Sequence, residues 1–163
     1  MPESVVCSSG GKVSNLIYFC IVAGIFVLDR GSKFLVSNLY GTGARLFFRR
    51  GFFSLRYVKN TGGAFGLFPR KSHVFLIVTL VAVALLVYLL FFSDVRYDLA
   101  KIGLALLLGG SLGNLVDRLI SGGVVDFIQF GRAPVFNLAD VAIVCGSGLI
   151  VFVLAGGPKL VGS

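Results

Sequence analysis

The sequence predicts an all-α membrane protein with four transmembrane helices and a small extramembrane β element between the first two helices. Of its 163 residues, 56% are hydrophobic and only 13% are charged, whereas a soluble domain carries roughly 25% charged residues. The mean hydropathy is +0.95. The apolar residues gather in four uncharged runs, so the composition excludes both a soluble globular domain and a disordered chain.

One of these runs is long enough to cross a bilayer unaided. Residues 74–92 contain no charge, and a helix needs roughly 20 residues to cross a hydrocarbon core of about 30 Å. The runs at 16–28, 102–116 and 141–155 are shorter and must include polar neighbours. We therefore expect a single membrane domain over residues 1–163, with helices over residues 13–33, 73–92, 98–118 and 136–156.

The first run also resembles the core of a signal peptide, because Lys12 precedes it. It ends in Leu28-Asp29-Arg30 and lacks the small-x-small pattern of a cleavage site. We expect a retained helix.

The stretch between the first two helices predicts a surface loop with short strands over residues 41–68. Aromatic and β-branched residues at 46–48 and 52–58 flank Arg49-Arg50-Gly51, a pattern typical of two strands around a turn. We expect this element to lie on the bilayer surface.

The net positive charge indicates which molecules the surface of the protein contacts. The chain has 15 Lys and Arg against 7 Asp and Glu, a formal net charge of +8. A nucleic-acid binder needs an exposed basic face, and most of this chain is apolar, so we expect contact with anionic membrane lipid and none with nucleic acid. Eleven of the cations lie on the side of the long loop, and the positive-inside rule by itself predicts that this side is cytoplasmic.

Four of the seven acidic residues gather on one membrane face if the helices cross in alternation. Asp29 and Asp117 follow the first and third runs, Asp140 precedes the fourth, and Asp126 lies between the third and fourth. Carboxylates at a membrane edge are costly and usually mark function. One of them alone can serve as an anchor at a helix end, but four on one side predict a site.

Two amides accompany these carboxylates. Asn114 precedes Asp117 by three residues and Asn137 precedes Asp140 by three, so each pair shares a helix face. Amides alone often hold membrane helices together, but that role requires no carboxylate beside each of them.

Paired carboxylates suffice for hydrolysis without a metal. Two of them within a few ångströms in a partly dry site share a proton and activate a water, which is the chemistry of aspartic proteases. The three cysteines lie far apart and His73 is the single histidine, so we expect no metal and no other cofactor. Spacing alone leaves open which two of the four carboxylates form the pair, and Asp117 beside Arg118 could be a structural ion pair.

Five sequence blocks occur in order along nearly the whole chain. They are Leu28-Asp29-Arg30-Gly31-Ser32-Lys33, Val58-Lys59-Asn60-Thr61-Gly62-Gly63-Ala64-Phe65-Gly66, Gly109-Gly110-Ser111-Leu112-Gly113-Asn114-Leu115-Val116-Asp117-Arg118, Val124-Val125-Asp126-Phe127 and Phe136-Asn137-Leu138-Ala139-Asp140. With four helices at this length, the chain resembles the lipoprotein signal peptidases (signal peptidase II). Gly63 and Ser111 each replace an alanine that is common in that family, a small residue for a small residue.

The resemblance implies a role for each matching position. Asp126 and Asp140 correspond to the family's catalytic pair. Residues that surround the site and orient it or bind substrate are Asn60, Gly62, Asn114, Asp117, Arg118 and Asn137. Asp29 and Lys33 match a block whose role is more architectural.

The resemblance also implies the reaction and the location. The protein is expected to be an intramembrane aspartyl endopeptidase that cleaves prolipoproteins just before the cysteine that carries diacylglyceryl. We expect it to act as a monomer. The family places the site at the outer, periplasmic face of the bacterial inner membrane and both termini in the cytoplasm, against the cation count. The alternative is a small proton-coupled transporter or channel subunit, in which intramembrane carboxylates are equally natural, although repeated halves would then be expected.

Overall fold

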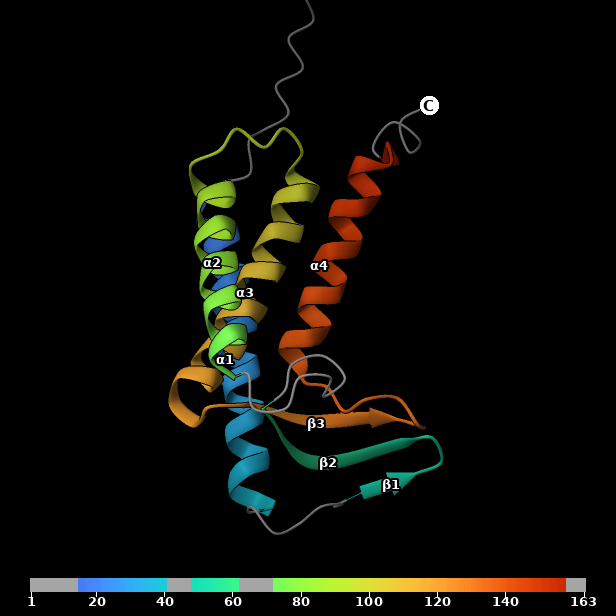
Figure 1. Cartoon of the computed structure of the whole chain (residues 1–163). Coiled ribbons are helices and arrows are strands. Elements are labelled where there is room, and N and C mark those ends of the chain that lie inside the picture. Colours follow the sequence, from blue (N-terminus) through green and yellow to red (C-terminus); the bar gives the residue numbers. More distant parts are fainter. Residues whose placement is uncertain (1–14, 41–47, 62–71, 158–163) are drawn as a thin grey trace, which may run out of the picture.

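The computed structural model describes residues 15–40, 48–61 and 72–157, and over these the chain forms four helices and three strands. In chain order they are α1 (Asn15–Tyr40), β1 (Phe48–Arg50), β2 (Phe53–Asn60), α2 (Ser72–Phe91), α3 (Asp98–Ser121), β3 (Val124–Phe130) and α4 (Leu138–Leu154). The helices stand side by side and the sheet lies across one end of the bundle (Figure 1).

Helix α3 is the centre of the bundle, because it packs against α1, α2 and α4. Glycines let the neighbouring backbones approach it closely. A Cβ atom on Gly109 would lie 2.9 Å from the carbonyl oxygen of Val22 in α1, and one on Gly110 would lie 2.5 Å from that of Ala139 in α4. Small residues at helix contacts are typical of membrane bundles, where backbones pack closely.

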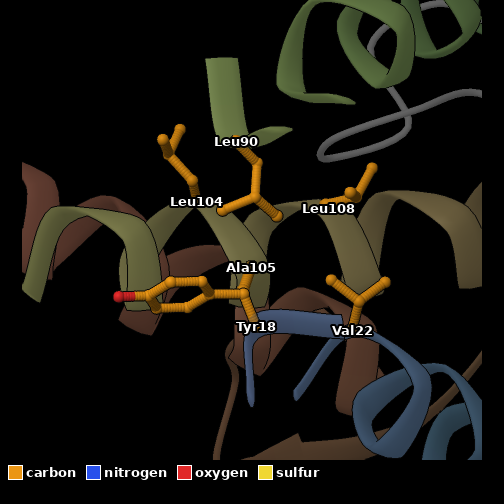
Figure 2. Packing of buried hydrophobic residues seen from close by; sticks show 6 residues of the cluster. All are labelled: Tyr18, Val22, Leu90, Leu104, Ala105 and Leu108. Atoms are coloured by element: carbon orange, nitrogen blue, oxygen red, sulfur yellow. The ribbon is translucent and has the colours of Figure 1, made fainter. Parts of the chain in front are cut away.

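The apolar core lies toward the end of the bundle away from the sheet. Figure 2 shows its buried side chains, which come from α1, α2 and α3: Tyr18, Val22, Leu90, Leu104, Ala105 and Leu108. The hydroxyl group of Tyr18 donates a hydrogen bond of 2.7 Å to Asp98, which ties α1 to the start of α3.

Two of the described helices are long and apolar enough to cross a membrane, namely His73–Phe91 and Asp98–Ser121. Helix α4 is apolar over a shorter length of 17 residues. Helix α2 also exposes large apolar side chains such as Ile77, Val81 and Leu85, which suits a lipid environment better than water.

The first and third helices run further than the sequence predicted. Helix α1 continues from the expected end at residue 33 to Tyr40, and the ion pair of 2.7 Å between Asp29 and Lys33 lies within it, one turn apart. Helix α3 continues to Ser121 and ends at Gly122, whose φ of 69° is the left-handed conformation that closes a helix. Helix α4 is shorter than expected and begins after Asn137.

The sheet corrects the predicted β element. Its strands are antiparallel in the order β1-β2-β3, so the strand after α3 joins the two that lie between α1 and α2. Arg49 and Arg50 belong to β1, and the turn falls at Gly51, whose φ is +59°. The predicted strand residues 46 and 47 and the rest of the loop at 41–47 and 62–68 lie outside the described residues.

Candidate active site

The first carboxylate of the site comes from the sheet. Asp126 lies in β3 opposite Val58 of β2 and is only 3% exposed. Its Oδ2 accepts a hydrogen bond of 3.1 Å from Nδ2 of Asn60, and its Oδ1 accepts one of 2.7 Å from Nδ2 of Asn137. Strand pairing therefore places Asn60 and Asp126 together, although 66 residues separate them.

The second carboxylate comes from the first turn of α4. Asn137 caps this helix: its Oδ1 accepts from the backbone N–H of Asp140 at 2.9 Å, and Oδ2 of Asp140 accepts from the backbone N–H of Asn137 at 3.3 Å. The Asn-x-x-Asp spacing is thus a reciprocal capping box. Because the same Asn137 also donates to Asp126, one residue holds both carboxylates.

Asn114 of α3 completes the link. Its Nδ2 donates to Oδ1 of Asp140 at 2.9 Å, while its Oδ1 accepts from Nζ of Lys33 at 3.0 Å and from Nδ2 of Asn137 at 3.2 Å. Two helices, the sheet and the α4 N-terminus therefore converge on the pair of aspartates.

The environment of Asp126 moves the pKa of its carboxyl group close to neutrality. Burial, reinforced by the negative charge of Asp140, raises the pKa of this carboxyl from 3.8 to about 7. The hydrogen bonds from Asn60 and Asn137 and the positive charge of Lys33 oppose the rise. A carboxyl group that titrates near pH 7 next to a second one is suited to proton transfer.

A group of charged side chains, most of them buried, lies next to the pair of aspartates. Lys33 forms ion pairs of 2.7 Å with Asp29 and 2.9 Å with Asp117, and Arg30 forms a further ion pair with Asp117. The carboxylates also hold backbone: Asp117 accepts from the N–H of Val125 at 3.2 Å, and Asp29 accepts from that of Ala139 at 3.0 Å. They thus fix the residue before Asp126 and the residue before Asp140.

Arg118 is not the ion-pair partner of Asp117 that adjacency suggested. Successive helix residues point in different directions, and Arg118 donates instead to the backbone oxygen of Asn114 at 3.3 Å. Its charge interacts with Asp140 and Asp126 and least with Asp117. Sequence reasoning missed Arg30 as the partner of Asp117, since 87 residues separate the two. Arg30 precedes Lys33 by three residues, so the two share one face of α1, and this spacing was the signal available in the sequence.

A cleft of about 1030 Å³ leads to the two carboxylates. Apolar side chains of two helices line it, Val78 and Ala82 from α2 and Ile143 and Val144 from α4. Polar residues of the cleft, besides the two aspartates, are Lys59, Asn60, Thr61, Thr79, Ser111, Asn114, Arg118, Gln129 and Arg132.

The predicted site residue Gly62 lies outside the described residues. Among the residues that the structure describes, no group of three or more His, Cys, Asp or Glu could hold a metal ion.

Fold and site together define a class of protein: a helical membrane protein whose cleft ends on two aspartates that are linked through Asn137. The fold is similar to a solved bacterial membrane enzyme determined by the in meso method at 2.3 Å resolution, with a TM-score of 0.78 and 30% identity over 86% of this chain and 88% of the other.

Sequence comparison gives the particular family. The family model of signal peptidase (SPase) II matches residues 21–155. The lipoprotein signal peptidase of Caldicellulosiruptor bescii is 39% identical over 89% of this chain and 96% of its own length. That of Moorella thermoacetica is 45% identical over 75% of this chain and 81% of its own length. The chain belongs to the signal peptidase II family, which confirms the resemblance of its sequence blocks and makes it a peptidase of a bacterial membrane.

Proposed function

We propose that the protein is an aspartyl endopeptidase that removes signal peptides from prolipoproteins, cutting just before the diacylglyceryl-modified cysteine. The observation that carries this proposal is the pair Asp126 and Asp140, linked through Asn137 at the end of a cleft that apolar side chains of α2 and α4 line on two sides. Family membership favours this activity over the proton-coupled transporter.

The proposed chemistry needs only the two carboxyl groups and a water. One carboxylate takes a proton from water while the oxygen of that water bonds to the scissile carbonyl carbon. The other carboxyl group gives its proton to the carbonyl oxygen. When the C–N bond of the tetrahedral intermediate breaks, the first group returns its proton to the leaving amine and the second regains one from a hydroxyl group of the intermediate. Asn60, Asn114 and Asn137 hold the pair in position through the hydrogen bonds described above.

The apolar walls of the cleft suit a lipid-bearing substrate. Val78 and Ala82 on one side and Ile143 and Val144 on the other belong to helices that also expose apolar side chains such as Leu85 and Val151. A signal peptide is itself an apolar helix, so both it and its diacylglyceryl group would reach the site from the surrounding lipid. Burial of apolar surface would then contribute much of the binding energy.

We propose four membrane crossings, with the sheet and site on the outer face of the inner membrane and the termini in the cytoplasm. Helix α1 begins and α4 ends at the end of the bundle opposite the sheet, which suits an even number of crossings (Figure 1). The cation count argues for the reverse orientation, but Arg30 and Lys33 are paired with Asp117 and Asp29 and carry little net charge to the surface. We also propose that the monomer is the active unit.

Cleavage of a defined precursor tests the function. The purified protein would be incubated with a precursor that carries diacylglyceryl on its cysteine, and the products would be analysed by mass spectrometry. We expect one cut, immediately before the modified cysteine. The matched control is the same precursor with serine in place of that cysteine, which cannot be lipidated and should remain intact. No cleavage of the lipidated precursor, or a cut elsewhere, would refute the proposal.

A further inference from the structure

Lys33 is a buried cation with three close polar contacts. Its side chain is 2% exposed, and Nζ lies 2.7 Å from Oδ2 of Asp29, 2.9 Å from Oδ2 of Asp117 and 3.0 Å from Oδ1 of Asn114. An ammonium group has three protons and no lone pair, so it can only donate. The contact with Asn114 is a hydrogen bond and the two contacts with carboxylates are ion pairs. Arg30 also pairs with Asp117, so two cations face two carboxylates and their charges balance.

The contact with Asn114 determines how that amide is turned. Because Nζ can only donate, the atom that faces it must be the carbonyl oxygen of the amide. The NH₂ group then faces Oδ1 of Asp140 at 2.9 Å. The flipped amide would bring NH₂ against the ammonium group and oxygen against the carboxylate, which are two repulsive contacts in a buried site.

The two carboxylates differ in how well their charge is stabilised. Asp140 receives the N–H of Asn114 and the backbone N–H of Asn137, and it lies in the first turn of α4, where the helix dipole favours a negative charge. The guanidinium group of Arg118 also interacts with Asp140. Asp126 is buried in the sheet and receives two amide donors without a helix terminus.

We infer that Lys33 is a positioning residue: it fixes the amide of Asn114 so that its N–H faces Asp140, and it thereby assigns the general base to Asp140 and the proton to Asp126. This inference rests on the proposed function. Asp140 takes a proton from the attacking water, and Asp126 gives its proton to the carbonyl oxygen. Asp140 then returns a proton to the leaving amine, and Asp126 regains one from the hydroxyl group of the intermediate, so both carboxyl groups end as they began.

Removing Lys33 alone would leave Asp29 buried with an unpaired charge, which usually destabilises a protein strongly. The test therefore uses the charge-neutral pairs Asp29→Asn/Lys33→Met and Asp29→Asn/Lys33→Gln, with Asp29→Asn as the matched control. Methionine has no donor, whereas glutamine ends in an NH₂ group that can still donate to Asn114. Cleavage of the lipidated precursor would be measured as kcat and KM across pH for each purified variant.

We expect the methionine pair to lower kcat about 100-fold with little change in KM, as misplaced catalytic groups do. The glutamine pair should recover part of this loss, and Asp29→Asn should retain most of the activity. Both pairs remove the cation that lowers the pKa of Asp126, so the alkaline limb of the pH profile should move to higher pH. Other charged groups around the pair remain in every variant: Arg30, Lys59, Asp117, Arg118 and Arg132.

The inference would be overturned if the methionine pair had the same kcat as the wild type. It would also be overturned if kcat and stability fell together while the pH profile stayed unshifted. If the methionine pair does not accumulate, Asn114→Ala provides the second arm, since it leaves the ion pairs of Lys33 intact. It should lower kcat by a similar factor at unchanged KM, and wild-type kcat would overturn the inference. Failure of the wild type to cleave refutes the proposed function instead, so the two failures are distinguishable.

Discussion

The carboxyl group of Asp126 is expected to make the folded protein less stable as the pH rises through neutrality. Burial, reinforced by the charge of Asp140, raises its pKa from 3.8 to about 7. The unfolded chain loses this proton near its ordinary pKa, whereas the folded chain keeps it up to about pH 7. Because the folded state binds more protons in this window, the free energy of unfolding falls across it, and the loss is complete above the folded pKa.

The size of the effect follows from the two pKa values. One unit of pKa difference corresponds to about 1.4 kcal/mol, so this carboxyl group removes about 3 kcal/mol of stability between pH 5 and pH 8. Asp126→Asn has no ionisable group and lacks this part of the pH dependence. It loses one of the two amide hydrogen bonds at Asp126 at every pH, which shifts its stability without changing the slope.

Thermal unfolding followed by circular dichroism in a neutral detergent would measure the difference. The stability of Asp126→Asn relative to the wild type should rise by about 3 kcal/mol from pH 5 to pH 8. Asp94→Asn is the matched control, because Asp94 is exposed in the connection between α2 and α3, far from the site. A relative stability that stays constant or falls with pH would refute the raised pKa of Asp126.

Three further predictions concern the metal, the topology and the packing. Chelators should leave cleavage unchanged, because two carboxyl groups supply the proton transfers; loss of activity that zinc or magnesium restores would contradict the mechanism. A reporter that is active only in the periplasm should be active when fused within residues 41–51 and inactive after Ser163, and the reverse pattern would support the cation count. Gly110→Ala should destabilise the protein by about 1 to 3 kcal/mol and reduce cleavage, because its Cβ would lie 2.5 Å from the carbonyl oxygen of Ala139, next to the site. Gly148→Ala, where nothing lies within 4 Å, should match the wild type in thermal unfolding and in cleavage, and equal behaviour of the two variants would contradict the packing account.

Local patterns predicted the helices because apolar runs and their polar borders are local properties. The four runs correspond to α1, α2, α3 and α4, although the ends differ by several residues. The ends depend on contacts that a run of apolar residues does not contain, such as the αL conformation of Gly122 and the cap formed by Asn137.

Non-local pairing was harder to predict. Strand β3 joins β2 through a register that sets Val58 against Asp126, and nothing near residue 126 in the sequence indicates that partner. The ion pair of Arg30 with Asp117 was missed for the same reason, since the adjacent Arg118 offered a simpler partner. The amides were predicted near the carboxylates from spacing and resemblance, but the direction in which each one donates follows only from the three-dimensional contacts.

Cleavage of a lipidated precursor by Asp126→Asn and Asp140→Asn, at matched amounts of folded protein, tests the central claim most directly. Each change keeps the size of the side chain and removes the ionisable oxygen, so neither variant should cleave detectably while both accumulate in the membrane. Asp29→Asn, prepared in the same way, should retain turnover because it holds backbone and Lys33 rather than the reacting atoms. Substantial cleavage by either Asp126→Asn or Asp140→Asn would contradict the assignment of the catalytic pair.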